Sequence, residues 1–145
     1  MKIITLSKAK KLSDREYKLL QGCITIERRL FPKHESLAAT LEIEARKQSQ
    51  DFVIMFDDEE KVVGYMIVSR SGHICKIAVA SDRQRQGFGR QLISWAKERH
   101  PALSLHVDPD RPAMKFYFTE QFQQLELLRD YYIAGRDAYL MKWHR

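Results

Sequence analysis

The sequence predicts one α/β domain over residues 1–145, built on a mixed but mostly antiparallel sheet with helices on both faces. The chain is long enough to bury a hydrophobic core, and 44% hydrophobic with 30% charged residues is typical of a globular domain. Apolar runs separated by short polar turns in the middle of the chain predict consecutive hairpin strands. Strand–helix–strand crossovers follow, and such crossovers add parallel neighbours to a sheet.

The expected elements follow in the order β-α-α-β-β-β-α-β-α-β-β. The first helix begins at a capping box formed by Ser13 and Glu16 and ends at the break Phe31-Pro32. A second helix is expected over residues 35–48, because apolar residues recur there at helical spacing. Strands are expected over residues 3–6, 52–56, 62–69, 74–79, 103–107, 125–132 and 137–143. Later helices are expected from residue 88 to the His100-Pro101 stop and over residues 112–121.

The net charge of the chain and its distribution indicate which class of ligand to expect. Lys and Arg number 25 against 19 Asp and Glu, which gives a net charge of +6. Arg83, Arg85 and Arg90 gather in one short loop, which favours a compact phosphate ligand over a long nucleic-acid duplex. No apolar run reaches the length of a membrane span. Cys23 and Cys75 lie far apart without a Cys or His cluster, so we expect no metal site, free thiols and a cytoplasmic location.

The loop Gln84-Arg85-Gln86-Gly87-Phe88-Gly89-Arg90 lies between a predicted strand and the start of a predicted helix. A helix N-terminus offers unpaired backbone N–H groups and the positive end of the helix dipole. Glycines allow unusual φ values and a close approach of the backbone to a ligand. With its flanking arginines the loop therefore predicts a phosphate site, although glycines at such a turn can equally serve tight packing.

At this loop the chain resembles the GNAT N-acetyltransferases. Ile77-Ala78-Val79 followed by Gln84-x-x-Gly87-x-Gly89 is similar to the acetyl-coenzyme A motif of that family. Leu105-His106-Val107 and Ala113-x-x-Phe116-Tyr117 are similar to its later strand and helix. The order of elements also agrees. The resemblance therefore covers essentially the whole chain and implies the GNAT fold, acetyl-CoA as cosubstrate and an acetyl transfer to a primary amine.

The resemblance also implies a place for each part of acetyl-CoA. The pyrophosphate would lie on the backbone N–H groups of residues 85–89. The pantetheine arm would run along the backbone of Ile77 and Val79, in a gap where two parallel strands splay apart. Asp110 and Arg111 are both candidates for the position at which family members usually carry an asparagine that orients the cofactor arm.

Three further segments resemble the branch of the family that acetylates protein N-terminal α-amines. Leu30-Phe31-Pro32 falls where that branch has a substrate-contacting loop, and Tyr131-Tyr132 falls where it has hairpin tyrosines over the peptide. Asp137-Ala138-Tyr139-Leu140-Met141 is similar to its last strand. Phe31, Pro32, Tyr131 and Tyr132 are therefore the expected substrate-binding residues.

Amide formation needs a neutral amine, a base for its extra proton and an acid for the leaving thiolate. Tyr117 matches the general acid of the family, while His73 and His106 are the candidate bases at the ends of two neighbouring strands. An α-amine has a pKa of about 7.7–8.0 and a lysine amine about 10.4, so a histidine base suits the α-amine better.

The sequence is also compatible with other acceptor amines and with one other class of protein. An acetyltransferase of small amines such as polyamines, or of protein lysines, would share every cofactor residue and differ at the acceptor cleft. A basic nucleic-acid-binding module could use the positive charge, but the sequence carries no RNA- or DNA-binding motif that we identify. Either a monomer or a homodimer is compatible with the sequence, and no membrane partner is expected.

Overall fold

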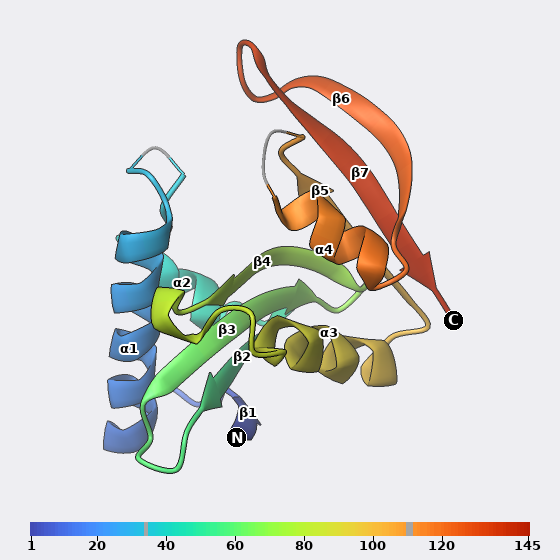
Figure 1. The fold of residues 1–145 in the computed structure, drawn as a ribbon. Helices are drawn as coiled ribbons and strands as arrows, with labels where there is room; N and C mark the ends of the chain where they lie inside the picture. The colour runs from blue at the N-terminus through green and yellow to red at the C-terminus, as the bar shows by residue number, and fades with distance from the viewer. Residues whose placement is uncertain (34, 110–111) are drawn as a thin grey trace.

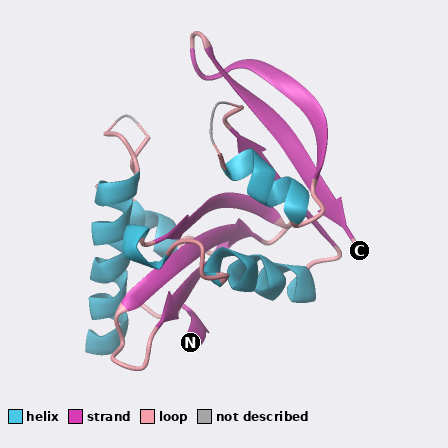
Figure 2. Cartoon of the chain, in the orientation of Figure 1, coloured by secondary structure: helices cyan, strands magenta, loops and turns pink. Residues whose placement is uncertain are grey.

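In the described residues, which are 1–33, 35–109 and 112–145 of the computed structural model, seven strands form one sheet (Figures 1 and 2). The order across the sheet is β1-β2-β3-β4-β5-β7-β6, and only β4 and β5 are parallel neighbours. The predicted mixed sheet is confirmed. Its strands are β1 (Lys2–Thr5), β2 (Gln50–Phe56), β3 (Val62–Ser69), β4 (His73–Val79), β5 (Ala102–Val107), β6 (Gln123–Ile133) and β7 (Arg136–His144).

The helices lie on both faces of the sheet, as the sequence predicts (Figure 1). α1 (Asp14–Leu30) and α2 (Leu41–Arg46) cover one face, while α3 (Phe88–Arg99) and α4 (Ala113–Thr119) cover the other. A short 3-10 turn, η1 (Ser81–Arg83), leads from β4 towards α3. The predicted capping box of α1 is present, with Ser13 and Glu16 satisfying each other's backbone N–H groups.

Strand β2 shows how one short apolar run builds both layers of the core. Phe52 and Ile54 belong to the core under α1 and α2. Val53 and Met55, which alternate with them, belong to the core under α3 and α4. Because successive side chains of a strand point to opposite faces, a strand covered on both faces is apolar at every position.

The second helix is shorter than the sequence predicts. The expected range was 35–48, whereas α2 spans Leu41–Arg46. The segment before it is held by tertiary contacts instead: the N–H of Leu37 donates to the Glu27 carboxylate at 3.0 Å. Leu37 also packs against the core under α1 from outside any helix. The helical spacing of the apolar residues in this segment therefore reflects which side chains are buried, although the segment before Leu41 is not a helix.

The parallel strands β4 and β5 share a short stretch of pairing and then diverge. In the described chain they pair at two positions, the second of which joins Ile74 to Leu105. Cys75, the next residue of β4, is the extra residue of a β-bulge against β3. A bulge bends and twists its strand. β4 therefore turns away from β5 directly after the last shared pair, which leaves the backbone edge of Lys76 to Val79 facing a gap between the two strands.

A buried carboxylate ties the helical layer to the sheet beside this gap. Glu27 of α1 is 0% exposed and accepts hydrogen bonds from the Tyr65 hydroxyl of β3 and the Leu37 N–H. The ammonium of Lys76, on β4, lies 3.2 Å from the same carboxylate. Burial raises the pKa of Tyr65, and the adjacent Glu27 raises it further, so the phenol keeps its proton and donates it. Three elements thus meet on one side chain.

Removal of the Glu27 carboxylate tests this arrangement. Glu27→Ala removes the buried carboxylate that accepts from the Tyr65 hydroxyl and pairs with the ammonium of Lys76. We expect the free energy of unfolding, measured by urea denaturation, to fall by about 3 to 5 kcal/mol. Glu59→Ala, in the exposed β2–β3 turn, is the control and should change it by less than about 0.5 kcal/mol. Equal effects of the two substitutions would contradict the role given to Glu27.

Candidate functional site

The loop after β4 leads into α3 through two residues with positive φ. Arg85 has φ +64° and Gly87, which precedes the first turn of α3, has φ +85°. The space beside Gly87 is open, since a Cβ placed there meets no described atom within 4 Å. Among the described residues, no side chain forms a capping hydrogen bond at this end of α3. The start of α3 thus has the backbone features on which the sequence bases an anion site, and the site itself stays a prediction.

The second glycine of the loop has a packing role. A Cβ at Gly89 would lie 3.3 Å from the Phe116 ring of α4, closer than nearly all Cβ contacts. Gly89 thus lets α4 approach the start of α3, where the sequence alone left ligand approach and tight packing both open. Phe88 and Val79 are partly buried against the same core.

The arginines of the loop are not equivalent. Arg83 donates to Asp57 at 2.8 Å, and Arg90 donates through Nε to Glu120 at 3.1 Å. Arg85 makes no ion pair with any described residue. Of these arginines it is therefore the one whose guanidinium is not held by a carboxylate in this part of the chain. Gln84 donates to the Val79 carbonyl at 3.1 Å and so ties the loop back to β4.

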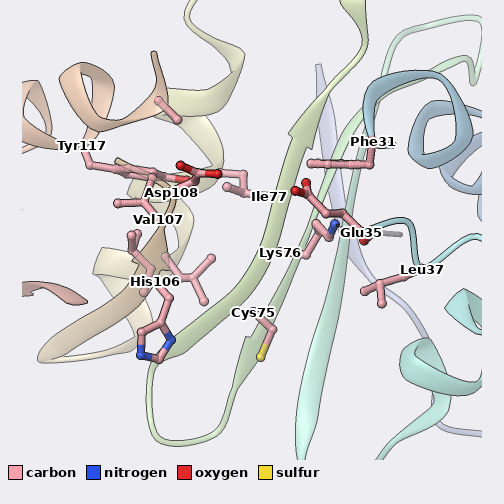
Figure 3. A pocket seen from close by; sticks show the side chains of 13 residues that line it. Phe31, Glu35, Leu37, Cys75, Lys76, Ile77, His106, Val107, Asp108 and Tyr117 are labelled. Carbon is pink, nitrogen blue, oxygen red and sulfur yellow. Dashed lines mark hydrogen bonds between the residues drawn. The ribbon is translucent and has the colours of Figure 1, made fainter. Parts of the chain in front are cut away.

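A cavity of about 420 Å³ opens in the gap between β4 and β5 (Figure 3). Figure 3 shows Tyr117, His106 and Asp108 on one side of β4, with Phe31 and Glu35 on its other side. The side chains of β4 line the middle. The full lining consists of Phe31, Glu35, Leu37, Ile74, Cys75, Lys76, Ile77, Leu105, His106, Val107, Asp108, Ala113 and Tyr117.

Two histidines meet where β4 and β5 pair. The rings of His73 and His106 lie with their centroids 4.9 Å apart. His73 Nδ1 shares a hydrogen bond with Ser104 Oγ at 2.8 Å, and His106 Nδ1 shares one with the Tyr131 hydroxyl at 3.1 Å. The Tyr131 ring also stacks on His106 with 4.4 Å between centroids. The structure thus joins His73, His106 and Tyr131, which the sequence placed in separate segments, and adds Ser104.

Burial shifts both imidazoles towards the neutral form. Burial lowers the pKa of His73, and the neighbouring His106 lowers it further. Burial also lowers the pKa of His106. A charged imidazole is disfavoured by loss of water and by a second imidazole nearby. At neutral pH both rings are therefore able to accept a proton.

Tyr117 lines the same cavity from α4 and is 7% exposed. Its ring makes edge-on contacts with Phe116 and Phe122, with centroids 5.2 and 5.7 Å away. These contacts fix the direction of the ring. Ile77 also lines the cavity, while Ala78 is buried in the core under α1.

The expected substrate-binding residues divide into three groups. Phe31 lines the cavity, and Tyr131 reaches it through His106. Pro32 is exposed and is not among the lining residues. Tyr132 lies in β6, but its side chain is outside the described part of the structure, as are Asp110 and Arg111 entirely.

Charged residues of the cavity wall were not singled out as site residues from the sequence. Glu35 and Asp108 are joined by Arg136, whose Nη2 donates to Glu35 at 3.0 Å and to Asp108 at 2.7 Å. Lys76 Nζ lies 3.5 Å from the centroid of the Phe31 ring, a cation–π contact. The sequence signal available for Asp108 is its place directly after an apolar strand. No local signal pairs it with Arg136, 28 residues away.

Two further observations concern the described residues only. None of their helices is both long and apolar enough to cross a membrane. Their His, Cys, Asp and Glu side chains form no group of three or more that could hold a metal ion. The cytoplasmic location stays a prediction.

Residues 17–142 match the family model described as an acetyltransferase (GNAT) domain. An N-alpha-acetyltransferase of Sulfolobus acidocaldarius is 28% identical over 121 residues, 68% of this chain and 72% of that protein. An N-alpha-acetyltransferase of Sulfurisphaera tokodaii is 33% identical over 79 residues, 50% of this chain. The match spans about half, 47%, of the length of that second relative.

Solved structures show the same fold. The structure of Ard1 from Thermoplasma volcanium superposes with a TM-score of 0.77 at 22% identity, covering 99% of this chain and 96% of that one. An aminoglycoside 6'-N-acetyltransferase complexed with coenzyme A superposes with a TM-score of 0.76 at 13% identity, covering 99% and 97%. Ard1 and an aminoglycoside 6'-N-acetyltransferase therefore share this architecture with the chain.

The histidine pair makes a prediction about pH. Because burial lowers both pKa values, we expect each imidazole of the folded protein to titrate below about 6.5 in an NMR titration. The unfolded chain then binds protons at a higher pH than the folded one does. Stability should therefore fall as the pH drops from about 6.5 through the folded pKa values. The reference is the same titration in urea, and a histidine that titrates at or above its value there would contradict the prediction.

Proposed function

Because the chain belongs to the GNAT acetyltransferase family, we propose that it transfers the acetyl group of acetyl-CoA to the α-amine at a protein or peptide N-terminus. The family membership makes it an N-acetyltransferase. The choice of acceptor rests on one observation above all, the pair formed by His106 of the cavity wall and the adjacent His73, both with lowered pKa values. The names of the two relatives from Sulfolobus acidocaldarius and Sulfurisphaera tokodaii support the same acceptor.

The histidines suit an α-amine because such an amine is already partly neutral. With a pKa of about 7.7–8.0, roughly a tenth or more of it is unprotonated at pH 7, whereas less than a thousandth of a lysine amine is. A weak base that is itself neutral at that pH can then take the remaining proton, directly or through water. His106 lines the cavity and His73 lies behind it, so His106 is the proposed first acceptor and His73 the second.

We place acetyl-CoA in the gap between β4 and β5. The uncapped start of α3 with Gly87 would hold the pyrophosphate, and the guanidinium of Arg85 would balance its charge. The backbone edge of Ile77 and Val79 would pair with the amides of the pantetheine arm. Bound there, acetyl-CoA supplies an acetyl group activated as a thioester.

Tyr117 is the proposed general acid. Its hydroxyl would give a proton to the thiolate released when the C–S bond breaks, while the amine nitrogen forms the new C–N bond. The phenylalanine rings around Tyr117 keep it in one orientation on the cavity wall. The proton taken by His106 and the proton lost by Tyr117 keep the reaction balanced overall.

A second candidate acceptor is a small amine such as a polyamine. The observation that favours it is the presence of two carboxylates, Glu35 and Asp108, in the wall of the cavity. Carboxylates in a partly dry site attract ammonium groups. Protein lysine is the third acceptor class, and the neutral histidines make it less suitable.

The loop assignment is tested at Gly87. Gly87→Glu places a negative charge where the pyrophosphate would lie, so we expect the Kd for coenzyme A, measured by calorimetry, to rise more than tenfold. Gly135→Glu is a matched control, because Gly135 has φ +82°, no described atom lies within 4 Å of an added Cβ, and it belongs to another turn. Both substitutions carry the same backbone strain. Normal coenzyme A binding by a folded Gly87→Glu variant would remove the loop from the site.

The role of Tyr117 is tested by Tyr117→Phe, which keeps the ring and removes the hydroxyl. We expect kcat to fall by about 10²-fold or more while the Kd for coenzyme A changes little. Tyr139→Phe on β7, whose ring also packs at the edge of the core, is the control for loss of a phenol. An unchanged kcat with saturating acceptor would exclude Tyr117 as the acid.

The acceptor is tested with one peptide in two forms, one with a free N-terminus and one capped and carrying an internal lysine. We expect faster acetylation of the free N-terminus, with kcat/KM rising between about pH 7 and 8 as the α-amine loses its proton. Protonation of the histidines should lower kcat/KM only below about pH 6.5. Replacing both His73 and His106 with alanine should lower kcat more than either single change. Faster turnover of the capped peptide or of spermidine would assign the protein to another acceptor class.

A further inference from the structure

One guanidinium joins two carboxylates of the cavity wall. Arg136 is the first residue of β7, and its Nη2 donates both to Glu35, in the segment after α1, and to Asp108, directly after β5. The two carboxylates are largely buried, with side chains 17% and 7% exposed. The segment after α1 and the end of β5, which both line the cavity, are therefore joined through a cation of β7.

Lys76, which does line the cavity, is also matched by an anion. Lys76 pairs with the fully buried Glu27 and lies against the Phe31 ring. Each carboxylate among the described lining residues, Glu35 and Asp108, thus already has the positive charge of Arg136 beside it. A second ammonium of a polycationic acceptor would have to displace that charge or lie next to it, and both are unfavourable in a partly buried site.

We propose that Arg136 is a specificity-determining residue that excludes acceptors with a second positive charge close to the reacting amine. It occupies, with the chain's own guanidinium, the place that the ammonium of a polyamine or of a basic first side chain would take between Glu35 and Asp108. This inference rests on the proposed function, because it concerns the acceptor side of the same cavity. Discrimination of this kind works by a built-in repulsion as much as by favourable contacts.

The β6–β7 hairpin holds Arg136 in this position. The N–H of Gly135 donates to the Asp130 carboxylate at 2.6 Å, and the N–H of Asp130 donates to Asp137 at 2.9 Å. These bonds cross the turn immediately before and after Arg136. A fixed turn reduces the freedom of the residue it presents, so the guanidinium is directed at the two carboxylates before any acceptor arrives.

The experiment compares acceptors in Arg136→Gln, Arg136→Lys and the wild type. The acceptors are spermidine and two peptides with free N-termini that differ only in their first residue, Met or Lys, with the acetylated nitrogen identified by mass spectrometry. In Arg136→Gln we expect kcat/KM for spermidine and for the Lys peptide, relative to the Met peptide, to rise at least tenfold. Arg136→Lys keeps a positive charge and should retain most of the wild-type preference.

Two further variants distinguish a local effect of Arg136 from a general effect of the net charge of the protein. Arg129→Gln removes a charge from an exposed position of β6 and should leave the ratio of acceptors within about twofold of the wild type. Glu35→Gln added to Arg136→Gln should reverse much of the gain, because it removes one of the two carboxylates that would bind the new ammonium. Thermal melting and coenzyme A binding establish that each variant is folded, and a misfolded Arg136→Gln would be replaced by Arg136→Met in the same comparison.

The proposal is overturned if the ratio in the folded Arg136 variants stays within twofold of the wild type. It is equally overturned if Arg129→Gln raises the ratio as much. A failure of the proposed function looks different, since it appears in the wild type as preference for a capped lysine peptide or for spermidine over any free N-terminus. The change of the ratio on substitution of Arg136 is measured independently of that preference.

Discussion

The divergence of β4 from β5 is the constraint on which the rest of the site depends. Pairing stops after Ile74, and the bulge at Cys75 turns the remainder of β4 away. Had the two strands continued side by side, their backbone groups would have satisfied each other and no edge would face the cavity. The divergence leaves that edge open, places the start of α3 beyond it and keeps the histidines together at the paired end. The extra residue Cys75 in β4 thus separates the paired end, where the histidines lie, from the open edge of the strand.

Because a gap in a sheet removes packing, the walls on either side must be held by other means. On the α1 side the buried Glu27 joins Tyr65, Lys76 and the N–H of Leu37. On the β7 side Arg136 joins two carboxylates from opposite walls. Polar networks in such positions are stable only when every member has its partner. The charges around the cavity therefore hold its shape, in addition to the role in acceptor choice proposed above for Arg136.

The histidines owe their chemistry to the same geometry. They lie where the strands are still paired, so their rings are close and partly removed from water. The hairpin lays Tyr131 on His106 because β6 bulges there: residues 129–132 lie opposite Asp137 alone. An exposed imidazole would be partly protonated near neutral pH, whereas these two are shifted to the neutral form. Burial, and not a carboxylate partner, is what favours the neutral protonation state of the two histidines.

The sequence by itself determined the order of the elements, while the phosphate-binding loop and the catalytic residues stay predictions. Such features depend on residues that are close together in the sequence. The alternation of a strand, the capping box of α1 and the positive φ of Gly87 are examples. The sequence misjudged the second helix because helical spacing cannot distinguish a helix from a turn fixed by Glu27. Only the tertiary structure decided which charges meet, since Arg136 finds Asp108 28 residues away and Glu35 101 residues away. No periodicity spans such separations, and the contacts exist because the sheet places β7 next to β5 and β5 next to β4.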